Sequence, residues 1–188
     1  MRISKAPEER KQEILDTAMR LFSTKGYNET TMADIAKEMN VVKGLCYRYF
    51  DSKQKLFESA MDEYVKQCSE VFINLIKDRS KPLNKRLDLL GSLMIETEEN
   101  SEYKSFFHKK GNEEFHERLT IKMCRYLSPY FEEEINRLCE LGELNVNNPK
   151  ILVDFIMYGQ VGLLSKTDDN IEEVVKEIRN YIDILLKA

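Results

Sequence analysis

The sequence is poor in the residues that build metal centres and disulfide frameworks. Its 4 cysteines are Cys46, Cys68, Cys124 and Cys139, and it has only 2 histidines. No two cysteines have the C-x-x-C spacing that is typical of zinc and redox sites, and the four are widely separated. We therefore expect reduced, buried thiols, with no metal and no cofactor.

Long apolar runs are also absent. No stretch is long enough to span a bilayer, and the first residues do not resemble a secretory signal. We therefore expect a soluble, cytoplasmic protein without a membrane partner. The chain has 188 residues and no internal repeat, so it can form one sizeable core, or a small module joined to a larger one.

The residue groups on which most enzymes depend are missing as well. We find no nucleophile with a partner base, no glycine-rich phosphate loop and no paired carboxylates in a plausible pocket. Glu96, Glu98 and Glu99 are interpreted as a solvated helix end. No catalytic residue is predicted, and a helical enzyme is kept only as a remote alternative.

Charge is distributed unevenly along a chain whose net charge is -4. Residues 1–55 carry 11 Lys and Arg against 8 Asp and Glu, and the remainder carries 18 against 25. Such asymmetry is typical of a nucleic-acid-facing end on an acidic body. A DNA-packaging protein without sequence preference is a weaker alternative, because the body is acidic and the basic face is compact.

Apolar residues recur with helical spacing along most of the chain, which predicts an all-α fold. The expected helices cover about residues 7–25, 31–39, 42–49, 51–79, 82–99, 102–110, 111–141, 149–166 and 169–187. Pro129 predicts a kink or break near Leu127. Gly159 and Gly162 lie inside the eighth helix, where we expect close contact with another helix.

The second and third predicted helices are short and joined by a tight turn. Thr31 and Asp34 have the spacing of a capping box, which starts a helix. Asn40 tolerates the left-handed backbone that a sharp turn needs. Cys46 and Phe50 are expected to face inward from the third helix, so its opposite side should face solvent.

The outward side of the third helix has the composition of a DNA-binding surface. It carries Lys43, Gly44, Tyr47 and Arg48, and phosphates and base edges are natural partners for such side chains. Gly44 weakens the helix by roughly 1 kcal/mol relative to Ala, which makes sense if the backbone approaches another surface closely. The alternative is a solvated face with a chance glycine.

From Ile14 to Phe57 the chain resembles the DNA-binding region of the tetracycline-repressor-like (TetR) family of transcriptional regulators. The matching residues are Ile14, Ala18, Leu21, Phe22, Gly26, Tyr27, Thr31, Ile35, Ala36, Val41, Lys43, Gly44, Tyr47, Tyr49, Phe50, Lys53, Leu56 and Phe57. The resemblance covers about a quarter of the chain. The rest is similar to the family in length and helical character only.

Four positions depart from the usual residues of that family. Asn40 stands for Gly, Val42 for Ser, Leu45 for Thr and Cys46 for Leu. The loss of Ser at position 42 removes a helix cap worth about 1 kcal/mol. Leu45 cannot hydrogen-bond a base, but it can contact a thymine methyl group. These departures affect the expected operator sequence more than the expected DNA binding.

The resemblance implies an N-terminal three-helix helix-turn-helix domain, residues 1–52, and a larger C-terminal helical domain for ligand binding and dimerisation, residues 53–188. It implies a repressor that binds a palindromic operator in double-stranded DNA as a homodimer, joined through about residues 149–187. Its implied DNA-binding residues are Lys43, Gly44, Leu45 and Arg48 at base edges, and Thr31, Tyr47, Tyr49 and Lys53 as phosphate contacts. An activator, or a regulator controlled by a partner protein, is the alternative.

A small, largely apolar or aromatic effector is expected to release the repressor from DNA. The expected pocket lies between the fifth and eighth helices, with His108 or His116 as a polar anchor. Its expected lining is Met94, Phe106, Phe107, Phe115, Met123, Tyr126, Phe155 and Tyr158. Aromatic and Met residues at helical spacing also occur in plain cores, so core packing is the alternative.

Overall fold

The computed structural model describes residues 5–100, 103–107, 109, 111–164 and 170–187, and every regular element among them is an α-helix. The helices are α1 (Pro7–Lys25), α2 (Met32–Glu38), α3 (Lys43–Tyr49), α4 (Lys53–Ile76), α5 (Leu83–Asn100), α6 (Lys104–Phe107), α7 (Glu113–Glu140), α8 (Pro149–Gly159), α9 (Val161–Leu164) and α10 (Ile171–Lys187). The predicted all-α class is confirmed. In this part of the chain no helix is both long and apolar enough to cross a membrane.

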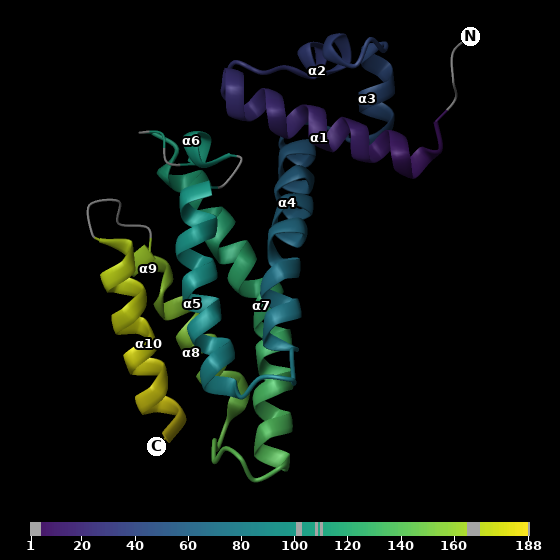
Figure 1. Ribbon diagram of the computed structural model, residues 1–188. Coiled ribbons are helices and arrows are strands. Elements are labelled where there is room, and N and C mark those ends of the chain that lie inside the picture. The colour runs from purple at the N-terminus through teal and green to yellow at the C-terminus, as the bar shows by residue number, and fades with distance from the viewer. Residues whose placement is uncertain (1–4, 101–102, 108, 110, 165–169, 188) are drawn as a thin grey trace.

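The first three helices form a small module at one end of the molecule (Figure 1). At the start of α2, the Thr31 hydroxyl accepts a hydrogen bond from the Asp34 N–H, and the Asp34 carboxylate accepts one from the Thr31 N–H. The turn into α3 passes through Asn40, whose φ of 54° is left-handed. Cys46 and Phe50 are buried. The predicted helix-turn-helix, with its capping box and its inner side, is confirmed.

The long helix α4 connects this module to the body of the protein. It starts beneath α1 and runs down the body beside α5 and α7 (Figure 1). Ser52 caps its first turn by accepting a hydrogen bond from the Lys55 N–H at 3.1 Å. One continuous helix therefore enters both parts of the molecule.

Two hydrophobic cores hold the helices together. The first combines buried side chains of α1–α3 with side chains of α4, α6 and α7, among them Phe22, Phe57 and Phe106. The second lies further along α4, α5 and α7, around Phe72 and Leu127. Since the first core takes side chains from both sides of residue 52, the domain boundary there stays a prediction.

A buried ion pair joins α4, α5 and α7 beside the second core. Arg86 is 2% exposed and Glu134 is 1% exposed, and the two charged groups are 2.8 Å apart. Arg86 also donates a hydrogen bond to the carbonyl of Ile76, at the end of α4. Arg137 donates two hydrogen bonds to Glu134. These bonds, with those from Arg137 contributing most, outweigh burial and lower the pKa of Glu134 to about 2.

The seventh helix is not broken near Leu127, and the alternative prediction of a kink there stays untested. α7 runs from Glu113 to Glu140 and includes Pro129. Proline removes one helical hydrogen bond, but Pro129 is exposed, whereas the nearby Leu127 and Leu138 are buried and pack α7 against its neighbours. This packing stabilises the helix more than the proline destabilises it.

The single helix predicted over residues 149–166 is instead interrupted. α8 ends at Gly159 and α9 begins at Val161, which gives ten helices in the described residues instead of about nine. Glycine is costly inside a helix and so favours an interruption here. A Cβ atom at Gly159 or Gly162 would have no neighbour within 4 Å. Among the residues that the structure describes, the close contact expected at these glycines is therefore not made.

Candidate nucleic-acid interface

One side of α3 faces solvent. Lys43, Gly44 and Arg48 are exposed, and the Tyr47 side chain is 43% exposed. The ammonium of Lys43 lies 5.3 Å from the centre of the Tyr47 ring. The structure therefore brings together a cation, a phenol hydroxyl and a bare stretch of helix backbone. We call these four residues the α3 face.

Two further predicted DNA-binding residues, Leu45 and Tyr49, lie at the edge of the α3 face. Both are half-buried, and Tyr49 packs against the first core. The guanidinium of Arg48 lies 5.9 Å from the centre of the Tyr49 ring. This cation–π contact holds Arg48 against the surface. The contacts of these residues with DNA stay predictions.

Val42 is an exposed residue beside the α3 face that sequence reasoning missed. Its side chain is 66% exposed. Helical spacing puts position 42 four residues before the buried Cys46, which suggests an inward direction. Val42 is, however, the N-cap, with the extended angles φ -76° and ψ 142°, so its side chain departs from the helical pattern. No side chain caps α3, as expected without Ser at this position.

Thr31 is engaged within the module. Its hydroxyl donates a hydrogen bond to Asp34 at 2.7 Å, and Lys25 forms an ion pair with the same carboxylate at 3.0 Å. These bonds, with those from Thr31 contributing most, lower the pKa of Asp34 to about 2. The Thr31 hydroxyl therefore starts α2, and its predicted phosphate contact remains untested.

Lys53 also has partners inside the protein. Its ammonium lies 4.4 Å from the centre of the Tyr27 ring and donates hydrogen bonds to the carbonyls of Tyr27 at 2.9 Å and Asn28 at 3.4 Å. Lys53 therefore ties the start of α4 to the loop between α1 and α2. A phosphate would have to compete with these carbonyls, so this phosphate contact also stays a prediction.

Gly44 allows a test of close approach to DNA. A Cβ at this position would have no neighbour within 4 Å, so Gly44→Ala should stabilise α3 by up to about 1 kcal/mol. If the backbone at position 44 approaches DNA, the added methyl group should weaken operator binding at the same time. Thermal unfolding and fluorescence anisotropy measure the two effects. Stabilisation with unchanged DNA affinity would remove Gly44 from the interface.

The residues predicted to line one ligand pocket are distributed over several places. Phe106, Phe107 and Phe115 lie in the first core with the side chains of the module. Met94 and Met123 pack against the second core. The helical spacing identified their apolar side correctly, but spacing cannot tell whether protein or ligand covers it. Core packing is the better description of these five.

Two more of the predicted pocket residues are on the surface. Phe155 is 66% exposed and Tyr158 is 40% exposed, so neither ring is enclosed by the described residues, and their contact with a ligand stays a prediction. α8 is apolar nearly all round, which made its sides indistinguishable in the sequence. Of the proposed polar anchors, His108 lies outside the described residues, and His116 is half-buried and has an interaction partner.

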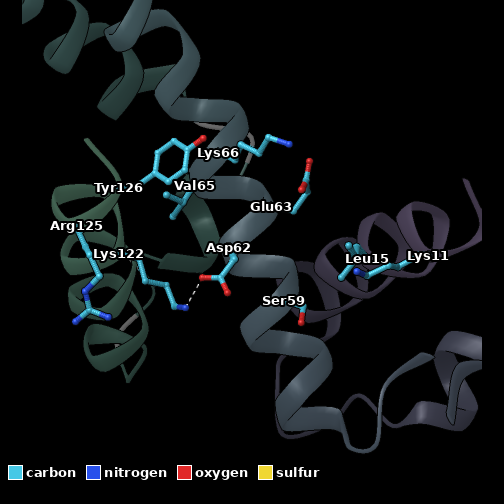
Figure 2. Close-up of a pocket in the computed structure, with 10 residues that line it drawn as sticks. All are labelled: Lys11, Leu15, Ser59, Asp62, Glu63, Val65, Lys66, Lys122, Arg125 and Tyr126. Carbon is cyan, nitrogen blue, oxygen red and sulfur yellow. Dashed lines mark hydrogen bonds and ion pairs between the residues drawn. The ribbon is translucent and has the colours of Figure 1, made fainter. Parts of the chain in front are cut away.

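The structure has an open groove of about 540 Å³ between α1, α4 and α7. Figure 2 shows α4 in the middle, with α1 and α7 on either side. The lining residues are Lys11, Leu15, Ser59, Asp62, Glu63, Val65, Lys66, Lys122, Arg125 and Tyr126. Of the eight residues predicted to bind a ligand, Tyr126 alone is among them. The groove therefore differs in place and charge from the predicted apolar pocket.

Comparisons of sequence connect this chain with known DNA-binding proteins. Residues 14–60 match the family described as bacterial regulatory proteins, tetR family. The biofilm operon icaADBC negative transcriptional regulator IcaR of Staphylococcus aureus is 38% identical over 86 residues, which are 46% of this chain and 44% of that protein. The regulator YuxN of Bacillus subtilis is 33% identical over 53% of this chain and 33% of its own length. The chain thus matches less than half the length of these relatives.

Comparison of structures extends the similarity to the whole chain. A TetR-family transcriptional regulator from Pectobacterium atrosepticum superimposes with a TM-score of 0.67, covering 95% of this chain and 93% of the other, at 16% sequence identity. A regulator of the TetR/AcrR family from Thermobifida fusca has a TM-score of 0.59 and 21% identity, with 93% and 96% covered. These likenesses confirm the fold of both the module and the body.

Proposed function

Because the chain belongs to the tetR family of bacterial regulatory proteins, we propose that it is a repressor that binds a palindromic operator as a homodimer. We also propose that a small, largely apolar or aromatic effector releases this repressor from DNA. Members of this family are DNA-binding regulators and not enzymes. Support for repression comes from IcaR, which is described as a negative transcriptional regulator.

The α3 face is the observation that carries this proposal. Its exposed Lys43 and Tyr47 can contact phosphates and base edges. The helix-turn-helix arrangement presents such a helix to the major groove. A single α3 helix offers few base contacts. Specific binding of an operator therefore needs two α3 helices, one from each subunit of a dimer. In a symmetric dimer they would meet two half-sites about one helical turn, or a multiple of it, apart.

Selection of bound duplexes from random DNA tests the operator proposal directly. We expect a palindromic consensus whose two half-sites have a constant spacing. A consensus with a single half-site would contradict the homodimer, and the absence of any consensus would favour non-specific packaging. A reporter gene downstream of the selected operator then separates repression from activation. Reduced expression is expected when the protein is present.

An exposed apolar surface on α8, α9 and α10 supports dimerisation. Its exposed large side chains are Ile151, Phe155, Tyr158, Leu163, Tyr181 and Ile184. Large exposed apolar side chains on neighbouring segments are typical of a protein interface, and the predicted dimer segment 149–187 contains all six. Gly159 and Gly162 lie in the same region with open space around them, which would let a partner helix approach closely.

Phe155→Asp combined with Ile184→Asp should convert the dimer into a monomer. Both side chains are more than 60% exposed in one chain, so the fold should tolerate the changes, while two buried carboxylates per subunit would strongly disfavour the interface. Light scattering after gel filtration should show a mass near 22.2 kDa for the variant and twice that for the wild type.

Val71→Asp is the matched control for this experiment. Val71 is an exposed valine on α4, outside the proposed interface, and its replacement should leave the dimer mass unchanged. A double variant that keeps the wild-type mass would refute the interface. A wild-type protein of 22.2 kDa would refute the homodimer itself.

The effector proposal draws support from the contact between the body and the module. Phe115 of α7 lies 5.1 Å from Phe57 of α4 and 5.4 Å from Tyr27 of the module, measured between ring centres. A ligand that displaced Phe115 would therefore disturb the α1–α3 module. Native mass spectrometry of the purified protein tests for a retained compound, and anisotropy with added compound tests release. A compound that binds without changing DNA affinity would favour control by a partner protein.

A further inference from the structure

We propose that the groove between α1, α4 and α7 binds a small amphipathic anion, with a carboxylate, sulfonate or phosphate head on an apolar body. Figure 2 shows the residues of this groove. The proposal concerns a surface that is separate from the α3 face and shares only Tyr126 with the predicted pocket of the body. Ligand binding there needs no DNA, so it can be tested independently of the proposed repressor function.

The base of the groove is apolar. Leu15 of α1 and Val65 of α4 are buried side chains that form part of its lining, and the half-buried ring of Tyr126 adds an aromatic surface from α7. The volume of about 540 Å³ lies within the range of small-molecule sites. The apolar part of a small ligand can therefore be removed from water here.

The rim of the groove carries exposed cations. Lys11, Lys66 and Arg125 come from three different helices, and none makes an ion pair or hydrogen bond with another described residue. Their charges are therefore available to a ligand. Charged hydrogen bonds between such groups and an anion are stronger than neutral ones. A neutral ligand would gain less from these three side chains, because their hydrogen bonds to a neutral acceptor are weaker than those to an anion.

The carboxylates in the groove have partners of their own. Asp62 accepts a hydrogen bond from Lys122, which also forms an ion pair with Glu58 at 3.1 Å. Glu63 accepts a hydrogen bond from Gln67 at 3.4 Å. These contacts reduce the repulsion that an incoming anion would meet. Burial lowers the pKa of Lys122, but its two carboxylate partners outweigh burial and raise it, so Lys122 stays charged.

The sign of the groove is opposite to that of its surroundings. Its lining contains four cationic side chains and two carboxylates, whereas residues 56–188 carry 18 Lys and Arg against 25 Asp and Glu. A local positive site on an acidic body attracts small anions. The excess of cations in the lining favours a ligand of negative charge over a metal cation.

The position of the groove suggests what the ligand does. Lys11 and Leu15 belong to the DNA-binding module, and Arg125 and Tyr126 belong to the body. A bound anion would interact with both and would bias the angle between them. This consequence rests on the proposed function, because it is read as a change in operator affinity. The binding step itself does not.

Fluorescence of 8-anilinonaphthalene-1-sulfonate, an amphipathic anion, tests the binding step with the full-length protein. We expect saturable enhancement that decanoate reverses and the neutral decanol does not. The triple variant Lys11→Ala, Lys66→Ala and Arg125→Ala should bind the dye at least about tenfold more weakly, because the positive charge of the groove is reduced by three. Circular dichroism checks that the variant is folded.

The control is a second triple variant, Lys37→Ala, Lys85→Ala and Lys109→Ala. These lysines are exposed and lie outside the groove, so the net charge changes equally while dye affinity should stay at the wild-type value. Equal affinities in the two triple variants would overturn the proposal, as would no dye binding to the wild type or equal displacement by decanol. Each of these results leaves the operator selection unaffected.

Discussion

Replacing Lys43 and Tyr47 together with alanine is expected to weaken operator binding by about 100-fold or more, or about 2.7 kcal/mol. The two side chains stand next to each other on the α3 face, 5.3 Å apart between the Lys43 ammonium and the Tyr47 ring centre. Each half-site of a symmetric operator would lose both contacts. Fluorescence anisotropy on the selected operator measures the change at constant salt.

The stability of the double variant should be close to that of the wild type. Lys43 and Tyr47 are exposed, and the core side of α3 is formed by Cys46 and Phe50, which the changes do not touch. Matching circular dichroism spectra would show that the loss of affinity arises at the interface. The variant Lys85→Ala removes one exposed lysine from α5 and should bind DNA as the wild type does.

Salt dependence distinguishes the roles of the two side chains. If Lys43 neutralises a phosphate, Lys43→Ala should reduce the slope of log affinity against log salt by about one per subunit, whereas Tyr47→Ala should leave the slope unchanged. Wild-type affinity in the double variant would end the assignment of the α3 face to DNA. An unchanged slope in Lys43→Ala would limit that residue to base contacts.

Glu134→Ala should lower the free energy of unfolding by about 3–5 kcal/mol, because it leaves Arg86 charged and unpaired in the interior. Arg86 is 2% exposed and its Nε has no hydrogen-bond partner even in the wild type. Its remaining contact would be the carbonyl of Ile76. Urea unfolding followed by circular dichroism measures the difference.

Glu133→Ala is the matched control on the same helix. Glu133 forms an exposed ion pair with Lys77 at 3.4 Å, and exposed pairs contribute only about 0–1 kcal/mol. Replacing both buried partners, Arg86→Met with Glu134→Leu, should recover most of the lost stability, since an apolar pair leaves no unpaired charge. Equal losses for Glu133→Ala and Glu134→Ala would mean that burial of the pair has no energetic effect.

The same ion pair predicts that the stability of the folded protein depends on pH. The pKa of Glu134 is about 2, below its ordinary value of 4.5. Because the carboxyl binds its proton more weakly in the folded state, its charge stabilises the protein above about pH 4.5, and this contribution is lost as the pH falls to about 2. The stability difference between wild type and Glu134→Gln should therefore shrink on acidification. A difference that grew would contradict the assignment.

Local patterns predicted the module well because its determinants are close in sequence. The capping box joins Thr31 to Asp34, three residues apart, and Asn40 has the left-handed φ of 54° that its side chain tolerates. The exposed direction of Lys43 and Tyr47 followed from the buried Cys46. Contacts with DNA depend on a partner outside the chain, so they remain predictions.

The body was harder to predict because its determinants are far apart in sequence. Arg86 and Glu134 are 48 positions apart, and no local signal marks either as buried. Phe106 and Phe155 both lie in apolar stretches of the sequence, but the first is covered by the module and the second faces solvent. Which surface covers an apolar side depends on tertiary packing, and no period in the sequence encodes it.

The shared first core bears on how such regulators can be recombined. Tyr27 of the module contacts both Phe57 at the start of α4 and Phe115 at the start of α7, at 4.8 Å and 5.4 Å between ring centres. A chimaera that joins the α1–α3 module to the body of another protein would expose these rings to solvent. To keep them buried, it would also have to include α6 and the first turns of α7. An exchange of this module between relatives during evolution would therefore have to include the aromatic residues of the body that contact Tyr27.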